Sequence, residues 1–268
     1  RAAEEEAQRK AAEEAGAPST PNGSEDPVSP TSEEARRCRR TSSVGEDGAS
    51  WAGVGVAAGV AVWRIEKSRA APWPRSDYGK FYKGDSYIVL HTLSNAAEGL
   101  SWHLFVWLGP RSSPDEQYGA AREAANLDKH LLGRAKQFRE TMGHESEEFH
   151  AMFDSIIYLD GGVDSMQGQQ DGEGGPARLL RVRRTGRNTK IFEVPLMRDS
   201  LTHGDCFILN AGKIIYTWMG DNSSTFEKNA CAMKAQNLSR EQTGSNVVEA
   251  DAKFWELLGG EGPVRNDD

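Results

Sequence analysis

The sequence predicts an α+β protein made of two similar repeats, each with a central mixed β-sheet between one long and one short helix. This prediction rests on a pattern that occurs twice. In each copy, a Gly-Asp pair opens an apolar run rich in β-branched and aromatic residues, which is typical of a strand. A second apolar run containing Trp-x-Gly follows, and a Ser-x-x-Glu sequence then begins a helix.

The two copies keep nearly the same spacing. Their Gly-Asp pairs lie at 84–85 and 204–205, and their helix starts lie at 113–116 and 224–227. The spacing from Trp-x-Gly to the helix start is the same in both copies. The first copy is longer between its two strands, and we place its extra residues in a loop around 93–100.

The helices are predicted from the period of their apolar residues. The first long helix covers about 114–131, is rich in alanine and ends near Gly133, which suits a C-cap. In the second, Phe226, Ala230 and Met233 recur at i, i+4 and i+7, which predicts one apolar face. A shorter amphipathic element follows each long helix, carrying Phe149 and Phe153 in the first copy and Phe254, Leu257 and Leu258 in the second.

Composition divides the chain into five parts. Residues 1–50 hold too few apolar side chains to offset the entropy of ordering, so we expect a disordered tail there. The first domain is expected over 51–165, a glycine-rich linker over 166–176, the second domain over 177–260 and a C-terminal tail over 261–268.

The bulk composition argues against several functions. The net charge of −8 disfavours broad nucleic-acid binding, which draws on positive charge. The longest uncharged interior stretch, 49–63, is too short and too glycine-rich to be a transmembrane segment. The three cysteines form no C-x-x-C pair, which disfavours structural zinc, and their odd, sparse number fits a reducing compartment.

No set of residues predicts an enzyme, because no nucleophile motif accompanies the acidic residues. His144 and His150 frame a sequence like H-E-x-x-H, but the second histidine is at i+6 and faces elsewhere on a helix. Residues 53–58 match the loose dinucleotide pattern without the strand and helix that this fingerprint requires. We therefore expect a binding protein.

The strongest candidate for chemistry is a recurring pair of acids, Asp85 with Glu116 and Asp205 with Glu227. A carboxylate at the mouth of a strand and another in the first turn of the next helix can converge into an all-oxygen site for calcium or magnesium. Two structural interpretations remain open at this point. Each glutamate completes a capping box with a serine three positions earlier, and an aspartate after glycine is an ordinary turn residue.

The segment 178–190 is strongly basic in an acidic protein and predicts a β-hairpin that turns near 185–188. It could bind an acidic protein surface or anionic lipid headgroups, or it could be a solvated edge whose charges deter edge pairing. Its basic residues are Arg178, Arg181, Arg183, Arg184, Arg187 and Lys190.

Together these features resemble the gelsolin/villin/severin family, over about 51–260 and in the order of its first two gelsolin-like domains. The matching stretches are 62–66, 78–88, 107–109, 115–116, 132–134, 144–146, 161–163, 193–195, 204–209 and 254–259. Members of that family bind actin monomers and filaments, and they cap and often sever filaments when calcium rises. The resemblance implies this calcium-regulated function, in the cytoplasm and at the cytoskeleton.

The resemblance also implies calcium ligands. In the first domain these are Gly84, Asp85, Glu116 and the carbonyl of Val163. In the second they are Gly204, Asp205 and Glu227, with no final ligand that matches. A further calcium shared with actin would use Asp128, which lies near a helix end where the dipole disfavours an acid, and the carbonyls of Gly133 and Ala135.

The family resemblance assigns the basic segment 178–190 to the filament side and to phosphatidylinositol bisphosphate. The sequence departs from the family on the long helix, where Arg122 and Ala125 replace the isoleucine and valine that meet actin. An alternative is therefore a calcium- or phosphoinositide-responsive module that has lost severing. Met219 replaces the cysteine that pairs with the Cys206 position in extracellular relatives, which favours a cytoplasmic protein.

Overall fold

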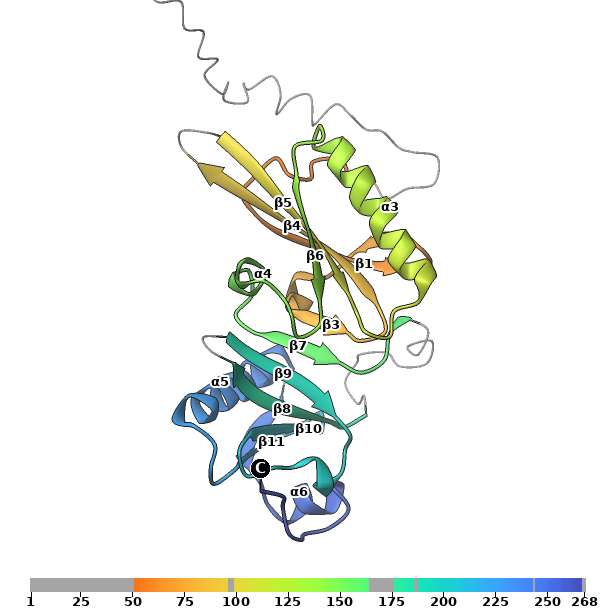
Figure 1. Cartoon of the computed structure of the whole chain (residues 1–268). Coiled ribbons are helices and arrows are strands. Elements are labelled where there is room, and N and C mark those ends of the chain that lie inside the picture. The colour runs from red at the N-terminus through yellow and green to blue at the C-terminus, as the bar shows by residue number, and fades with distance from the viewer. Residues whose placement is uncertain (1–50, 96–98, 164–175, 186–187, 243, 267–268) are drawn as a thin grey trace, which may run out of the picture.

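A computed structural model describes residues 51–95, 99–163, 176–185, 188–242 and 244–266 (Figure 1). The predicted N-terminal tail, most of the predicted linker and Arg187 lie outside the described residues. Of the helices in the described part, none is long and apolar enough to cross a membrane.

The first repeat is built on a five-stranded mixed sheet in the order β2-β1-β4-β5-β6. Its pairs are antiparallel except β5 with β6, which run parallel. The strands are β1 (Gly59–Glu66), β2 (Arg69–Pro72), β4 (Ser86–Asn95), β5 (Gly99–Leu108) and β6 (Lys136–Thr141). A 3-10 turn, η1 (Arg75–Asp77), precedes β3 (Lys80–Tyr82).

Two helices cover opposite faces of this sheet. Alternate residues of β4 show it, because side chains of a strand point to opposite faces in turn. Ile88 and Leu90 pack in one cluster with the long helix α3 (Pro114–His130), whereas Tyr87 packs in another with the short helix α4 (Glu147–Ala151). The predicted arrangement of a sheet between a long and a short helix is confirmed (Figure 1).

The second repeat follows the same plan. Its long helix is α5 (Thr225–Glu241) and its short helix is α6 (Ala252–Leu257). The two helices pack against alternate residues of β10 (Cys206–Asn210) and lie in different clusters. The helix α5 packs in one cluster with Ile208, and α6 packs in another with Phe207. The other strands are β8 (Arg178–Thr185), β9 (Asn188–Val194), β11 (Ile214–Met219) and β12 (Asn246–Glu249), and η3 (Arg198–Ser200) is a 3-10 turn.

The second sheet does not stop at the boundary between the repeats. Its order is β12-β11-β10-β8-β9-β7-β3, so β3 and β7 (Ile156–Leu159) of the first repeat extend the sheet of the second. The strands β7 and β9 run parallel, with Ile157 opposite Ile191. The rings of Tyr158 and Phe192 lie 4.9 Å apart across the same seam. The repeats therefore share one core cluster.

A buried ion pair reinforces this seam. Lys190 on β9 donates to the Oε2 of Glu145 at 3.1 Å and to the carbonyl of Gly143 at 3.1 Å. The hydroxyl of Tyr158 and the indole of Trp107 donate to the other oxygen, at 2.7 and 3.2 Å. Burial opposes the charge, but these hydrogen bonds outweigh it, so the pKa of Glu145 lies below its ordinary value.

The structure corrects two expectations. Residues 93–95 and 99–100, which we expected in a loop, belong instead to β4 and β5, ten-residue strands that pair from Ser86 to Asn95. The apolar face predicted on the second long helix is not the buried one. Phe226 is 64% exposed and Met233 is 66% exposed, while Cys231 and Leu238 face the sheet.

Candidate functional site

The first acid pair centres on Asp85, which is 0% exposed in the turn between β3 and β4. Arg64 on β1 reaches its Oδ2 at 2.6 Å. The backbone N–H of Val163 donates to Oδ1 at 2.8 Å, and the Tyr87 hydroxyl lies 3.5 Å from Oδ2. Asp85 and Val163, far apart in sequence, are thus brought together, through the Val163 N–H.

Arg64 is itself held in place by aromatic rings. Its side chain is buried, and its guanidinium lies 5.3 Å from the ring centre of Trp73 and 4.9 Å from that of Tyr82. Such cation–π contacts hold a guanidinium most strongly where water is excluded. One positive charge is therefore fixed on one side of Asp85.

Glu116 completes the capping box at the start of α3. The N–H and hydroxyl of Ser113 donate to its Oε2 at 2.9 and 3.1 Å, and the Glu116 N–H donates to Ser113 Oγ at 3.2 Å. The capping interpretation of this glutamate is confirmed, but capping is not the only interaction that Glu116 makes. Glu116 lies near enough to Asp85 for its charge to act on that carboxyl.

The pKa of Asp85 is raised above its ordinary value. Burial is the largest cause, the Val163 N–H and Arg64 oppose it, and the charge of Glu116 adds to it. A bound cation would stabilise both carboxylates at once, because it would relieve burial and mutual repulsion together.

Glycines let the backbone close tightly around Asp85. The Gly84 N–H donates to the carbonyl of Gly161 at 2.8 Å. A Cβ atom on Gly162 would lie 2.7 Å from Asp85 Oδ1, and one on Gly84 would lie 2.6 Å from the Gly161 carbonyl oxygen. Any other residue at these two positions would push the two chain segments apart.

These donors fit calcium. Within the described ranges, no three His, Cys, Asp or Glu side chains come close enough together to hold a metal. The family resemblance implies that the carbonyl oxygens of Gly84 and Val163 would add further ligands. Two carboxylates completed by backbone oxygens make an oxygen-only donor set, which suits calcium and not zinc.

The second acid pair has more positive charge around it. Asp205 is 2% exposed, and its Oδ2 accepts from Arg181 Nε at 2.7 Å, from a second nitrogen of the same guanidinium and from the Thr202 hydroxyl at 2.8 Å. Arg183 Nε lies 4.0 Å from the other oxygen. The strand β8 thus supplies two arginines to one carboxylate.

Glu227 also has its partners. Ser224 donates to its Oε2 at 2.7 Å within a second capping box, and the Arg184 backbone N–H donates to Oε1 at 3.0 Å. Burial disfavours its charge, but these hydrogen bonds outweigh burial, so its pKa lies below the ordinary value. The donor types again suit calcium, yet both carboxylates are already satisfied by protein groups.

Asp128 closes the C-terminal end of α3. Its Oδ1 accepts from the Ala135 N–H at 3.1 Å and its Oδ2 from the Gln137 amide at 3.1 Å, while its carbonyl accepts from the Gly133 N–H at 2.8 Å. These donors give the unfavourably placed acid a structural role, and they bring Asp128, Gly133 and Ala135 together.

The family model described as "Gelsolin repeat" matches residues 67–150 and 188–250. The chain belongs to the gelsolin family. The two matched regions correspond to the two repeats of the fold, so the prediction of two gelsolin-like domains is confirmed.

Three relatives show the range of the family. A gelsolin from Gallus gallus is 40% identical over 76% of this chain and 27% of its own length. Villin-2 from Arabidopsis thaliana is 38% identical over 81% of this chain and 24% of its own. "Actin depolymerising venom protein gelsolin 1" from Platymeris rhadamanthus is 38% identical over 70% of this chain and 51% of its own. The chain spans about a quarter of the length of the first two relatives.

The outer face of the gelsolin-family long helix α3 carries Arg122 and Ala125, both exposed. Arg122 donates to the carbonyl of Ser68 at 2.7 Å and lies 3.2 Å from Glu123, so the hairpin between β1 and β2 holds it down. Tyr118, one turn earlier, is 69% exposed. Sequence reasoning missed it, although i, i+4 spacing from Arg122 places it on that face.

The basic segment is divided by its contacts. Lys190 is buried against Glu145, Arg181 pairs with Asp205, and Arg178 lies 3.9 Å from Glu193. Arg183 is exposed, and the Arg184 guanidinium lies 4.4 Å from the ring centre of Phe226. The structure therefore does not gather the segment's charges on one surface.

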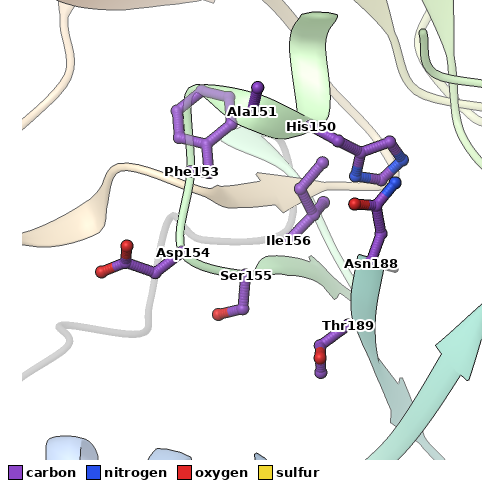
Figure 2. Close-up of a pocket in the computed structure, with 8 residues that line it drawn as sticks. All are labelled: His150, Ala151, Phe153, Asp154, Ser155, Ile156, Asn188 and Thr189. Carbon is purple, nitrogen blue, oxygen red and sulfur yellow. The ribbon is translucent and has the colours of Figure 1, made fainter. Parts of the chain in front are cut away.

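A pocket of about 250 Å³ lies at the seam of the repeats. Figure 2 shows its lining, with residues 150–156 of the first repeat on one side and Asn188 and Thr189 of β9 on the other. Burial and the charge of Lys190 lower the pKa of His150 in its wall, against the opposing pull of Glu145. The pocket contains none of the predicted site residues.

Proposed function

We propose that this chain is a calcium-regulated actin-binding protein of the cytoplasm and cytoskeleton that caps and severs actin filaments. It binds through preformed surfaces and needs no catalytic set. Membership of the gelsolin family supports this proposal, as does a relative whose name describes actin depolymerisation. The proposal extends the family's activity to a chain that spans only part of the length of its relatives.

One observation carries the calcium part. Asp85 is buried, faces a second carboxylate and has a raised pKa despite its arginine partner. Calcium would supply the missing positive charge, and Gly84, Asp85, Glu116 and Val163 would hold it. With calcium bound there, the start of α3 and the turns at 84–85 and 161–163 would be tied together.

The actin-facing surface proposed is the outer face of α3, with Arg122, Ala125 and Asp128 and with Tyr118 added. Asp128 and the carbonyls of Gly133 and Ala135 would hold the calcium shared with actin. At that interface Asp128 would exchange its present hydrogen bonds for the cation.

A second candidate function is a calcium- or phosphoinositide-responsive module that has lost severing. It is favoured by Arg122, which is tied to Ser68 where relatives present an apolar side chain. Arg183 and Arg184 are the basic residues that would reach a phosphoinositide headgroup, because Lys190 is buried and Arg181 is paired with Asp205.

The test uses the whole chain in pyrene-actin and co-sedimentation assays, in calcium and in chelator. Capping and shortening of filaments only in calcium is the expected result. Asp85→Asn keeps the size of the side chain and should abolish the calcium response, while Asp199→Asn, an exposed acid away from the proposed calcium sites, should not. Calcium binding by the parent protein without any effect on actin would favour the second candidate function.

A further inference from the structure

Two buried cysteines lie beside the second acid pair. Cys206 is the first residue of β10 and follows Asp205 directly. Cys231 lies on α5, one turn after Glu227. Both thiols are free and 0% exposed, and nothing in the proposed binding function uses them.

The two thiols contact each other. They lie close together in one core cluster, where α5 packs against β10. Cys206 Sγ lies 3.3 Å from the Ser223 hydroxyl, and Cys231 Sγ lies 3.6 Å from the carbonyl oxygen of Phe207, the residue after Cys206. Cys231 therefore reaches the backbone of β10 right beside Cys206.

We propose that Cys206 and Cys231 are a modification site that oxidises to an intramolecular disulfide joining β10 to α5. A disulfide needs two side chains that converge from packed backbone segments, and these two meet within one core cluster. On the neighbouring strand β11, the residue paired with Cys206 is Met219, which has no thiol. Cys231 on α5 is therefore the thiol available to Cys206 within the described part of the second repeat.

The reaction is a double exchange with a small-molecule disulfide, for which oxidised glutathione serves. One thiol loses its proton, and its sulfur attacks the oxidant, so that a mixed disulfide forms and one reduced glutathione leaves. The second thiolate attacks the mixed disulfide, the Cys206–Cys231 bond forms and a second reduced glutathione leaves. Two protein thiols are oxidised and one glutathione disulfide is reduced. The oxidant reaches the buried pair through local opening of α5.

The crosslink would connect the two elements that carry the second acid pair. Asp205 precedes one cysteine and Glu227 lies one helical turn before the other. An oxidised protein would therefore hold α5 against β10 while these carboxylates keep their separation. The same bond would lower the entropy of the unfolded chain, which stabilises the second repeat.

The experiment uses the whole chain with Cys38→Ser, so that only these two thiols remain. It is incubated with oxidised glutathione, denatured and assayed for free thiols, and its peptides are identified by mass spectrometry. We expect both thiols to disappear, a mass lower by two hydrogen atoms and a peptide linking the two cysteines. The melting temperature should rise by about 10 °C and return on reduction.

The matched controls are Cys206→Ser and Cys231→Ser in the same background, which should keep one thiol or carry one glutathione and show no rise in melting temperature. The proposal is overturned if the two-cysteine protein stops at a mixed disulfide, crosslinks between chains, or keeps both thiols under conditions that oxidise the denatured chain. These readouts do not involve calcium or actin. A negative result here would therefore not count against the proposed function.

Discussion

The two repeats place the same two acids in different electrostatic surroundings. Asp85 has one arginine, and burial together with the charge of Glu116 raises its pKa, whereas Asp205 has two arginines near its carboxylate. The difference comes from the neighbouring strand, because β1 supplies one arginine and β8 supplies two. A repeated motif therefore fixes where the acids lie but not how strongly they need a cation.

The largest expected effect concerns stability. Asp85→Ala leaves Arg64 buried without its ion-pair partner and should cost about 4 kcal/mol of the free energy of unfolding. Asp205→Ala leaves arginines that reach water more easily, and should cost about 2 kcal/mol. Urea unfolding in chelator measures both. Equal losses would contradict the contrast drawn between the two pairs.

The second effect concerns calcium affinity. Arg181→Gln removes the strongest cationic partner of Asp205 and should raise the calcium affinity of the second pair about tenfold, or about 1.4 kcal/mol. Calorimetric titration in an Asp85→Asn background isolates that site. Arg178→Gln, on the same strand but paired with Glu193, is the control and should leave affinity unchanged. An unchanged affinity in Arg181→Gln would mean that the arginine does not compete with calcium.

The third effect separates the pairs by pH. The raised pKa of Asp85 means that this group favours the calcium-free fold below its ordinary pKa of 3.8, and that this contribution is lost as pH rises through the folded pKa. The lowered pKa of Glu227 acts in the opposite sense. Its contribution is present above the ordinary 4.5 and is lost as pH falls through the folded pKa.

Carboxyl-carbon NMR titration measures both groups directly. In chelator, Asp85 should titrate above its ordinary value and Glu227 below it. Calcium should lower the Asp85 midpoint strongly and move Glu227 less. Midpoints in the reverse order would show that the two strands do not set the charge state of these acids.

The smallest effect on stability concerns the long helices. The outer face of α3 carries Arg122 where α5 exposes the apolar Phe226 and Met233. Arg122→Ile loses the hydrogen bond to Ser68 and the ion pair with the buried Glu123, and should lower the free energy of unfolding by about 1 kcal/mol. Its actin affinity, measured with pyrene-actin, should rise if α3 meets an apolar cleft. Lys213→Ile, an exposed position on the second repeat, is the control, and equal affinity in both would exclude that contact.

Local patterns predicted most of the elements. The capping serines marked both long helices, and the apolar runs that follow each Gly-Asp pair marked strands. The position of Arg64 within an apolar run was a usable signal, since a buried arginine needs an acid partner. No such signal existed for Arg181, because it stands among other arginines whose partners depend on which strand lies beside β8.

The failures share one physical cause. Phe226 and Met233 have a perfect helical period, but the sheet covers the face of Cys231 and Leu238 instead, so period alone did not choose the side. Lys190 was counted with a solvent-facing basic segment, yet the pairing of β7 with β9 places it against Glu145 of the other repeat, just before α4. Both outcomes depend on contacts between elements far apart in sequence.

The shared sheet has a mechanical consequence. Turning one repeat against the other would require breaking the parallel ladder of β7 and β9 and pulling Lys190 away from a buried carboxylate. Both steps are costly, because Lys190 and Glu145 are buried at this seam. We therefore expect the two repeats to move together as one rigid body, so that a displacement applied at α3 is carried through the strands to α6, toward the opposite end of the molecule (Figure 1).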